Sequence, residues 1–415
     1  MPSQPRIAIV GGGPGGLTLG LLLHKHGIPA TIYELRQKPT EQEIAKPSGM
    51  LDLHEGSGLA VIKEIGLFDD FIPLTGDCVE AMWLSDKNGH IVFQEKEYHK
   101  GYRPEVSRHA LNQLLINNLP LEAIKWDHKL ISATSTTTTD GHTETELNFG
   151  THGKQKFDLV LGADGAWSRV RKLLTDDKPY YAGKQVITLT IKNISDKYPH
   201  LAKLVGPGTF AALEGGYGVI AQHGSSDSSR IYIMLTLDEE DFATTSGLAG
   251  LPPTAAKDKL LSSEPMLGSW GAPIKELVAA GCDEEAADNP SATLDIRALY
   301  THPVGFTWEH KPGMTLIGDA AHLMLPSGEG VNIAMLDALL LSRAIIKAFE
   351  TTAVNKGDPS SSFRGTCDTF LREYEVDLAL RAKEAAEHAI YINDIMYGED
   401  GAEALAKVLQ GFSGR

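Results

Sequence analysis

The feature that most constrains this chain is a cluster of glycines between a strand pattern and a helix pattern. Residues 7–34 read IAIVGGGPGGLTLGLLLHKHGIPATIYE. Each glycine gives up more backbone freedom on folding than any other residue, so such a cluster implies that bare backbone is required. Gly11, Gly13 and Gly16 follow the apolar run 7–10 with the spacing G-x-G-x-x-G and open a leucine-rich helix. The stretch therefore predicts a strand–helix–strand unit of a parallel sheet.

This spacing indicates a dinucleotide-binding turn. The first glycine makes the tight turn, the second lets backbone approach a pyrophosphate, and the third lets the helix lie close to the strand. Pro14 suits the first helical turn, because a helix has no use there for the N–H that proline lacks. Glu34 ends the second strand 23 residues after Gly11, where a carboxylate can bind a ribose hydroxyl. A carboxylate there repels a 2′-phosphate, which favours FAD or NAD over NADP; a glycine-rich turn without a ligand is the alternative.

Composition narrows the class of protein. The 415 residues carry a formal net charge of -16, which argues against nucleic acid or an anionic membrane surface as partner. The three cysteines lie far apart without metal or disulfide spacing, and the N-terminus has no signal-peptide pattern, so we expect a cytoplasmic protein without a metal. The most apolar helix pattern, 333–346, is interrupted by Asp337, Ser342 and Arg343 and does not fit a membrane span.

The order of patterns predicts an α/β fold with an inserted domain. Strand and helix patterns alternate in the first third, with strands at 7–10 and 30–34 and helices at 54–65 and 107–118. Consecutive strand patterns without helices occupy 184–237, which favours an antiparallel sheet. We expect three parts, namely a discontinuous dinucleotide-binding domain (1–180 and 300–360), a substrate domain (181–299) and a C-terminal helical segment (361–415). The polar stretch 133–143 reads as a hairpin tip or surface loop.

Two further motifs follow strand patterns. GADGAWSRVR, residues 162–171, places Asp164 in a turn, and Ser168 can cap the helix expected next. LIGDAAHLMLPSGEGVN, residues 316–332, places Asp319 directly after a strand. Each motif read alone indicates only a strand-ending turn.

In this order, the three motifs resemble those of the class A flavin-dependent monooxygenases of the aromatic-hydroxylase type, which have a Rossmann-like FAD-binding domain. The resemblance covers nearly the whole chain and implies that the first motif binds the ADP part of FAD. It implies that Asp319 binds the ribityl chain and that Gly330, Val331 and Asn332 face the pyrimidine edge of the flavin. A helix that begins there would stabilise the negative charge of reduced flavin.

Two other stretches are similar to the tetracycline-inactivating monooxygenases within this class. These are GMLDLHEGSG (49–58) and PEVSRHALNQLL (104–115), and the resemblance implies FAD contacts for Asp52 and Arg108. The full set of expected FAD-binding residues is Gly11, Gly13, Pro14, Gly15, Gly16, Glu34, Leu35, Arg36, Asp52, Arg108, Asp164, Gly318, Asp319, Pro326, Gly330, Val331 and Asn332.

The chain also departs from these relatives. Their glutamate–arginine pair at the end of the second strand is here Glu34-Leu35-Arg36, which displaces the cation. Their proline-x-x-glycine-glutamine-glycine loop is one residue shorter here, and Glu329 replaces the glutamine. An acid is therefore expected close to the flavin, and its effect on reactivity is an open question.

The resemblance implies a flavin monooxygenase that uses NADPH or NADH and O2. Its substrate would be a polycyclic enol or phenol, with tetracycline as one candidate. Because the cofactor carries the chemistry, no catalytic side chain is expected. A phenol or polyketide hydroxylase, a flavin dehydrogenase or reductase on the same fold, and a non-catalytic FAD-binding module are the alternatives. The Trp-x-Trp-x-Ile-Pro signature of flavin halogenases is absent.

The substrate pocket is expected between the flavin and the antiparallel sheet, closed by the C-terminal helix. Its candidate lining residues are Tyr217, Gln222, His223, Met324 and Met396, and each has ordinary packing or a surface position as its alternative. Lys46 is a candidate contact for NAD(P)H, with a solvated loop lysine as the alternative. Gly206-Pro207-Gly208 lies among strand patterns and reads as a turn rather than a second nucleotide site. We expect a monomer.

Overall fold

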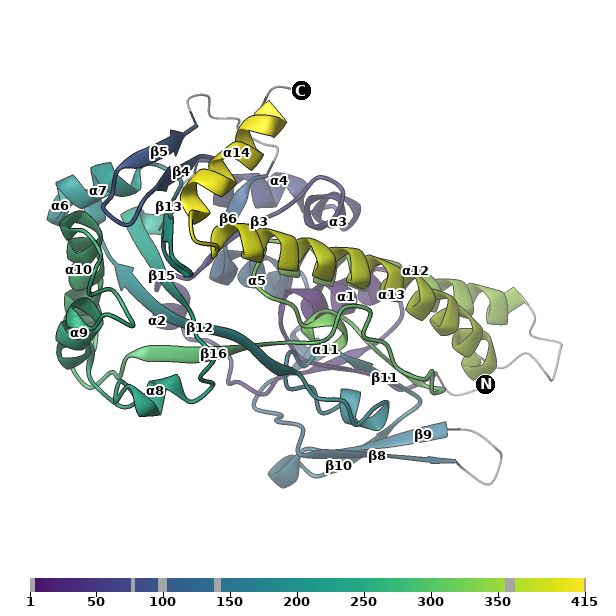
Figure 1. Ribbon diagram of the computed structural model, residues 1–415. Coiled ribbons are helices and arrows are strands. Elements are labelled where there is room, and N and C mark those ends of the chain that lie inside the picture. The colour runs from purple at the N-terminus through teal and green to yellow at the C-terminus, as the bar shows by residue number, and fades with distance from the viewer. Residues whose placement is uncertain (1–3, 76–78, 96–102, 138–142, 355–362, 414–415) are drawn as a thin grey trace.

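The computed structural model (Figure 1) describes residues 4–75, 79–95, 103–137, 143–354 and 363–413. Cys78 lies outside the described residues. The helices are α1 Pro14–Lys25, α2 Glu41–Ile44, α3 Gly58–Glu64, α4 Phe68–Phe71, α5 Arg108–Asn117, α6 Ile194–Lys197, α7 Pro199–Val205, α8 Phe242–Thr245, α9 Pro253–Ser262, α10 Ala272–Asp288, α11 Asp319–His322, α12 Gly330–Val354, α13 Phe363–Met396 and α14 Gly401–Ser413. The strands are β1 Ile7–Val10, β2 Thr31–Tyr33, β3 Met50–Asp52, β4 Met82–Ser85, β5 Ile91–Gln94, β6 Glu105–Ser107, β7 Ile124–Lys125, β8 Ser132–Thr137, β9 Thr143–Asn148, β10 Lys154–Phe157, β11 Leu159–Gly162, β12 Tyr180–Ile191, β13 Thr209–Glu214, β14 Tyr217–Gly224, β15 Ser228–Thr236, β16 Asp295–Thr301 and β17 Met314–Leu316.

A parallel sheet of five strands, in the order β17-β11-β1-β2-β7, forms the first layer. All four residues of β1 and of β11 are buried, as expected for parallel strands that are covered on both faces. Helix α12 packs against α1 and α13, and α12 and α13 run side by side in Figure 1. Because the strands are parallel, the loops that follow β1, β11 and β17 leave the sheet at the same edge.

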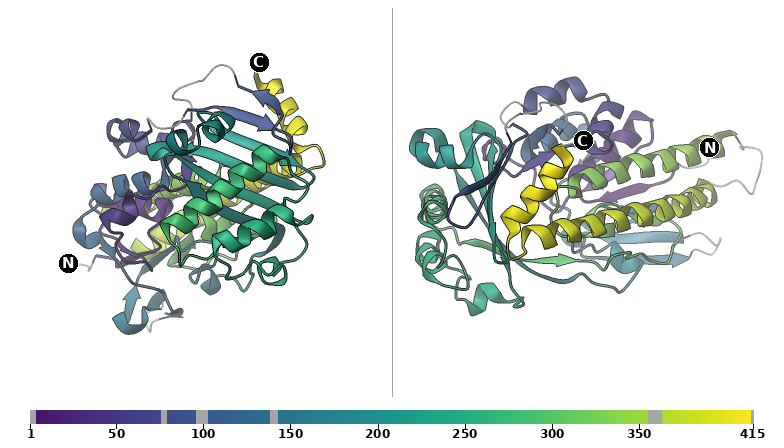
Figure 2. Two further views of the ribbon diagram at one scale, coloured as in Figure 1. Left: turned by 90° about the vertical axis from the view of Figure 1, so that its left-hand side faces the viewer. Right: turned by 45° about the horizontal axis from the view of Figure 1, so that its top comes forward.

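A seven-stranded sheet, in the order β16-β12-β15-β14-β13-β4-β5, forms the second layer. All its neighbouring strands are antiparallel except β13 and β4, which are parallel, and it is called the antiparallel sheet below. Its outer face is covered by α7, α8, α9 and α10, and the two long helices α9 and α10 cross this face in the left view of Figure 2. Alternate residues of β12, namely Ile187, Leu189 and Ile191, belong to that outer core. The intervening residues Thr188 and Thr190 therefore point to the inner face, toward the parallel sheet. Helix α14 packs on the inner face at the β13–β4–β5 end.

The α/β fold class is confirmed, with a parallel sheet, an antiparallel sheet and C-terminal helices. The strands expected within 184–237 are present as β12, β14 and β15, and the polar stretch 133–143 belongs to the β8–β9 hairpin, whose residues 138–142 lie outside the described part. Residues 206–208 form the turn between α7 and β13. The sequence patterns did not reveal β4 and β5, which lie in the first third of the chain yet join the second sheet.

One expected helix is wrong. The strand β11 is followed by a turn and a single 3-10 turn at Arg171–Leu173, not by an α-helix. Asp164 accounts for the difference, because its carboxylate accepts hydrogen bonds from the backbone N–H groups of Arg169 at 2.7 Å and Val170 at 3.2 Å. These bonds hold the chain in a compact turn in place of a regular helix.

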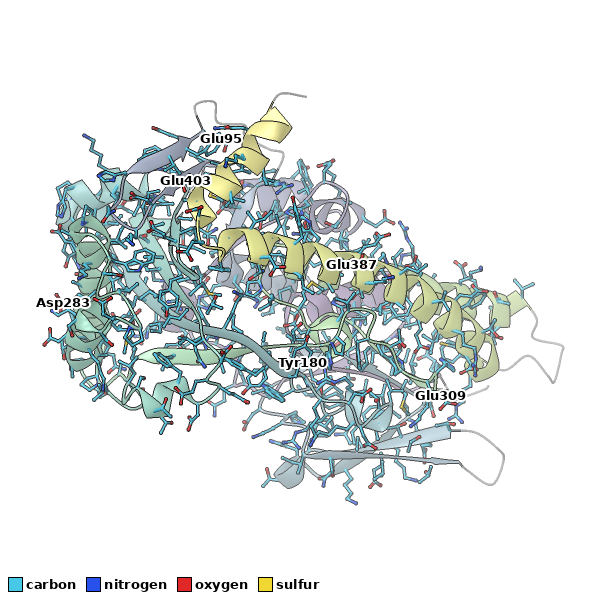
Figure 3. All side chains as sticks on the ribbon, in the orientation of Figure 1. Glu95, Tyr180, Asp283, Glu309, Glu387 and Glu403 are labelled. Carbon is cyan, nitrogen blue, oxygen red and sulfur yellow. The ribbon has the colours of Figure 1, made fainter. Side chains whose placement is uncertain are left out.

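The negative charge is distributed over the molecule. Figure 3 labels Asp283, Glu309, Glu387 and Glu403, which are exposed and belong to separate parts of the chain. Among the described residues, no helix combines the length and the apolar character needed to cross a membrane.

Candidate functional site

The glycine loop after β1 combines two tight contacts with one open position. A Cβ atom on Gly11 would lie 2.1 Å from the Ala163 carbonyl oxygen, and the backbone has φ +113° there, so only glycine fits. A Cβ atom on Gly16 would lie 2.0 Å from the Gly11 carbonyl oxygen, which explains how α1 approaches the loop so closely. A Cβ atom on Gly13 would meet no atom within 4 Å. The N-terminus of α1, with Pro14 in its first turn, therefore faces open space that can receive an anionic group.

Glu34, directly after β2, stabilises this loop by hydrogen bonds. Its buried carboxylate accepts hydrogen bonds from the backbone N–H groups of Gly12 at 2.7 Å and Arg36 at 2.9 Å. A ribose hydroxyl would share the same carboxylate. The neighbouring side chains of Leu35 and Arg36 are exposed.

Asp164 organises the turn after β11. Its carboxylate also accepts a hydrogen bond from Ser168 Oγ at 2.5 Å, and burial raises the pKa of the Asp164 carboxyl group. The contacts of Asp164 are thus those of a turn residue.

Arg171, from the same motif, is almost fully buried and reaches the third motif. Its guanidinium donates to the carbonyl oxygens of Ala320 at 3.0 Å and Ala166 at 2.7 Å. Arg171 is the last residue of the motif 162–171, and the sequence pattern did not reveal that it links the two motifs.

Asp319 begins α11 directly after the strand β17 and residues 317–318. Its side chain is accessible to solvent, yet protein surrounds it on most sides. This partial desolvation raises the pKa of the Asp319 carboxyl group, and the charges of His322 and Arg108 act in the opposite direction. The carboxylate of Asp319 can therefore be reached from solvent, and the charge of Arg108 acts on it. Gly318 precedes it with φ +58°, where a Cβ atom would lie 3.1 Å from the Ala334 Cβ atom.

A buried ion cluster holds this third motif in place. Asp337 on α12 accepts hydrogen bonds from Gly318 N at 3.0 Å, His322 Nε2 at 2.6 Å and Arg381 Nη1 at 2.6 Å. Burial alone would raise the pKa of Asp337, but His322 and Arg381 outweigh it and lower that pKa. Asp337 thus stays charged, and through it Arg381 of α13 fixes the backbone beside Asp319.

The loop before α12 is tied to the 49–58 segment by one buried amide. Asn332 Nδ2 donates to the carbonyl oxygens of Asp52 at 2.9 Å and Gly328 at 3.3 Å, while Asn332 Oδ1 accepts from His54 N at 2.8 Å and Gly58 N at 3.2 Å. The side chain of Asn332 is thus committed to the protein. The backbone at the start of α12 remains available, since a Cβ atom on Gly330 would meet no atom within 4 Å.

A charge cluster lies beside that helix start. His54 bonds Asp52 Oδ2 through Nε2 at 2.8 Å and lies 3.3 Å from Glu329 Oε1 through Nδ1. Burial by itself lowers the pKa of His54, but the two carboxylates outweigh burial and raise it to about 9. The hydrogen bond with His54 in turn lowers the pKa of Glu329.

These parts meet at one edge of the parallel sheet. The glycine loop follows β1, Asp164 follows β11, and Asp319 lies just beyond β17, and β11 stands between β1 and β17. The starts of α1 and α12 lie close together, because a Cβ atom on Gly15 would be 3.1 Å from the Ala334 carbonyl oxygen. Two open helix N-termini, together with the solvent-accessible carboxylate of Asp319 after β17, fit the pyrophosphate, ribityl chain and flavin ring of FAD.

The inner face of the antiparallel sheet presents a polar row to this edge. Arg230 lies opposite Thr190 on one side and Gln222 on the other, and Arg230 Nη1 donates to Thr190 Oγ1 at 2.5 Å. Gln222 Nε2 donates to Glu105 Oε2 at 2.9 Å, and Glu105 is the register partner of Asp52. The row therefore reaches the 49–58 segment. This segment lies at the edge of the parallel sheet described above, which is called the cofactor edge below.

Strand alternation separates the expected lining residues. Tyr217 and His223 occupy the opposite face of β14 from Gln222, and Tyr217 Oη donates to the Pro265 carbonyl oxygen at 3.3 Å on the outer, helix-covered side. The structure does not bring Tyr217 and His223 to the cofactor edge.

The other expected residues lie around the rim. Met324 is half-buried just after α11, and Met396 ends α13 beside the core formed with α14. The carbonyl oxygen of Pro326 accepts a hydrogen bond from Asn393 Nδ2 of α13 at 2.9 Å. Lys46 is exposed, and its role toward NAD(P)H stays a prediction.

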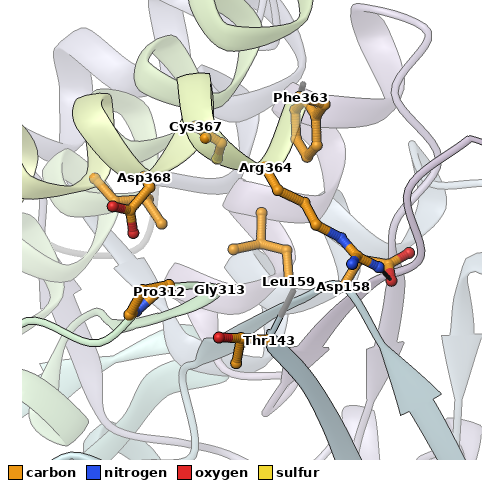
Figure 4. Close-up of a pocket in the computed structure, with 11 residues that line it drawn as sticks. Thr143, Asp158, Leu159, Pro312, Gly313, Phe363, Arg364, Cys367 and Asp368 are labelled. Atoms are coloured by element: carbon orange, nitrogen blue, oxygen red, sulfur yellow. Dashed lines mark hydrogen bonds and ion pairs between the residues drawn. The ribbon is translucent and has the colours of Figure 1, made fainter. Parts of the chain in front are cut away.

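A cavity of about 230 Å³ lies elsewhere, between β11, the β9 strand and the start of α13 (Figure 4). Leu159, the first residue of β11, lines it, whereas the cofactor edge follows the last residue of that strand. Arg364 and Asp158 form an ion pair at its wall. The cavity is therefore separate from the site described above.

Comparison with known proteins gives consistent matches. The model of the FAD binding domain family matches residues 5–245 and 302–357. The monooxygenase penA of Penicillium thymicola is 33% identical, and the match covers 98% of this chain and 99% of penA. The monooxygenase asqM of Emericella nidulans is 30% identical with the same coverage.

Solved structures share the fold. Klebsiella pneumoniae HpxO, complexed with FAD and uric acid, superimposes with a TM-score of 0.71 at 19% identity, covering 99% of this chain and 93% of HpxO. The tetracycline destructase Tet(55) superimposes with a TM-score of 0.63 at 18% identity, covering 97% of this chain and 98% of Tet(55).

Proposed function

We propose a substrate class for this chain, which belongs to the FAD binding domain family and is an FAD-dependent monooxygenase. The proposed reaction adds one atom of O2 to an electron-rich carbon of a polycyclic enol or phenol, with NADPH or NADH as the reductant. Tetracycline is the first compound to test. FAD supplies the redox chemistry when it is bound, and the protein supplies binding, orientation and electrostatics.

The proposed cofactor placement follows the open positions. The pyrophosphate would lie at the α1 N-terminus beside Gly13, and the ribityl hydroxyls would bind the carboxylate of Asp319. The pyrimidine edge would face the backbone of Gly330 and Val331 at the start of α12. The pyrophosphate and the pyrimidine edge would each put negative charge against a helix N-terminus, where the helix dipole is favourable.

The observation that carries the substrate class is the polar row of Thr190, Arg230 and Gln222 on the inner face of the second sheet. Arg230 Nε is buried and has no hydrogen-bond partner among the described residues, although Nη1 is bound to Thr190. A half-buried guanidinium with a spare donor suits an enolate or phenolate oxygen, because charge-assisted hydrogen bonds are stronger than neutral ones. Arg230 would thereby hold the substrate in its deprotonated, electron-rich form and orient the ring toward the flavin.

The fused-ring part of the proposal is supported by the structural neighbours, one of which is complexed with uric acid and another of which is a tetracycline destructase. We also propose a cytoplasmic location. The two described cysteines, Cys282 and Cys367, are buried free thiols, which is usual in a reducing compartment.

The test is a substrate panel with matched arginine variants. Purified enzyme is incubated in air with NADPH and with tetracycline or simple phenols, and the product mass is measured. Arg230→Met should raise KM for the accepted substrate while leaving FAD binding intact, and Arg230→Lys should restore part of the affinity.

Arg297→Met is the matched control, because Arg297 projects from the same sheet but is already bound to Thr188 Oγ1 at 3.0 Å and Asp295 Oδ1 at 3.1 Å. Equal effects of the Arg230 and Arg297 variants would contradict the assigned role of Arg230.

A further inference from the structure

The charge cluster at the start of α12 combines opposing electrostatic effects. The helix N-terminus favours negative charge in front of Gly330, but Glu329 brings a full negative charge to the same place. His54 lies between the carboxylates of Asp52 and Glu329, at 2.8 Å and 3.3 Å. The His54 side chain is only 15% exposed, so solvent screens these charges less than it would on an open surface.

The cluster is built into the fold rather than formed by flexible surface chains. The buried amide of Asn332 bonds the backbone on both sides, at Asp52 and His54 in one segment and at Gly328 in the other. The distances within the cluster therefore depend on a buried contact between the two segments. If Glu329 were only a solvated surface carboxylate, no buried contact would be needed to hold its distance to His54.

We propose that His54 and Glu329 form a charge pair that sets the reduction potential of the bound flavin. The proposal rests on the cofactor placement given above. Reduction adds negative charge at the pyrimidine edge, and an unpaired carboxylate at Glu329 would oppose it. Protonated His54 cancels that charge, so the N-terminus of α12 can stabilise reduced flavin.

The net charge of the cluster also depends on the other charged groups around the pair. Asp52 contacts His54 from the opposite side, and Arg103 acts on Glu329 from a distance. Glu55 is bound to Lys63 at the surface. Counting Asp52, His54 and Glu329 alone, the cluster carries one net negative charge in the wild type, none in Glu329→Gln, two in His54→Gln, and one in the double variant.

This count gives an ordered expectation for the midpoint potential of the FAD-loaded protein, measured by spectroelectrochemistry at one pH with FAD in excess. The potential should be highest in Glu329→Gln and lowest in His54→Gln. The double variant should return toward the wild-type value. Glu55→Gln, which removes an exposed carboxylate one residue from His54, should leave the potential unchanged.

The outcomes separate this inference from the proposed function. Wild-type protein that binds no FAD would contradict the proposed function itself. Wild-type protein that binds FAD, with equal potentials in all four proteins, would overturn only the charge-pair inference and leave the cluster as a clasp between two segments. A variant that cannot retain FAD also counts against the inference, because a tuning pair leaves the pyrophosphate and ribityl contacts intact.

Discussion

At the scale of single residues, the glycine loop holds one glycine in open space and another in a tight contact. Gly13 has an extended backbone, φ −78° and ψ 177°, and open space where its side chain would point. Gly16 has the Gly11 carbonyl oxygen 2.0 Å from the position of a Cβ atom. Gly16 thus serves the packing of α1, and we propose that Gly13 serves binding.

Substitution of these two glycines should therefore give opposite results. Gly13→Val should fold with a near-normal melting temperature yet lose FAD, because its side chain occupies the space of the pyrophosphate. Gly16→Ala should lower the melting temperature, since α1 must move away from the loop. Circular dichroism and flavin absorbance measure the two effects, and full flavin occupancy in Gly13→Val would contradict the assigned site.

Asp319 and Asp164 form a second matched pair. Asp319→Ala should weaken FAD binding by about 1.5–3 kcal/mol, the usual range for a hydrogen bond to a charged group. Asp164→Ala should mainly lower the stability of the turn, because the oxygens of Asp164 are bound to Ser168 and to backbone N–H groups. Reconstitution of apoprotein with FAD, followed by flavin fluorescence, gives both dissociation constants; a larger loss in Asp164→Ala would reverse the assignment.

His54 predicts a pH dependence of stability. Its folded pKa is raised from 6.5 to about 9 by Asp52 and Glu329 against the effect of burial. A raised pKa means that the stabilisation is complete below pH 6.5 and is lost as the pH rises through about 9. The stability difference between wild type and His54→Gln in urea should therefore shrink over this window, and a difference independent of pH would contradict the assigned ion pairs.

At the scale of elements, helix α13 supports the proposed cofactor site although it lies far away in sequence. Arg381 reaches Asp337 on α12, Asn393 holds Pro326, and Tyr374 Oη donates to the Leu316 carbonyl oxygen at 3.3 Å. The helix thus supports the whole stretch from β17 to the start of α12.

Removal of Arg381 should consequently affect both stability and FAD binding. Arg381→Met leaves Asp337 without one of its two cationic partners in the interior, a loss of about 3–5 kcal/mol for a broken buried pair. Arg372→Met removes an exposed partner of Asp368 on the same helix and should cost about 0–1 kcal/mol. Urea unfolding and FAD titration test both variants, and equal costs would show that the Asp337 cluster is not important for stability.

The sequence predicted the elements whose signals are local. The glycine loop, the position of Asp319 after β17 and the strands within 184–237 all rest on short patterns. The contacts of Asp337 with Arg381 and of His54 with Glu329 join residues that are distant in sequence, so spacing could not reveal them. A polar residue inside the apolar pattern of α12 was visible at Asp337, but its partner was not.

Strand alternation along β14 predicts which of the expected lining residues can share one face of the sheet. Tyr217 and His223 have the same parity along β14, and Gln222 has the other, so the three could not share one face. The short strands β4 and β5 carried no clear alternation, and their place in the second sheet depends on pairing with the distant β13.

At the scale of the whole molecule, the two sheets meet at the site. The carboxyl edge of the parallel sheet carries the residues proposed to bind the cofactor, and the inner face of the antiparallel sheet carries the polar row with Arg230. In the right view of Figure 2, α14 lies against the antiparallel sheet, and α13 extends from there beside α12. The domain limits 1–180 with 300–360, 181–299 and 361–415 stay a prediction.

The central claim is that this enzyme transfers an oxygen atom from O2 to its substrate. A dehydrogenase on the same fold would not do so. The most direct measurement is therefore the product mass after incubation with a fused-ring enol such as tetracycline, NADPH and heavy-isotope O2. The predicted product contains one heavy oxygen atom and is formed in step with NADPH oxidation. NADPH oxidation that yields only hydrogen peroxide or an unlabelled, desaturated product, with every polycyclic enol and phenol in the panel, would contradict it.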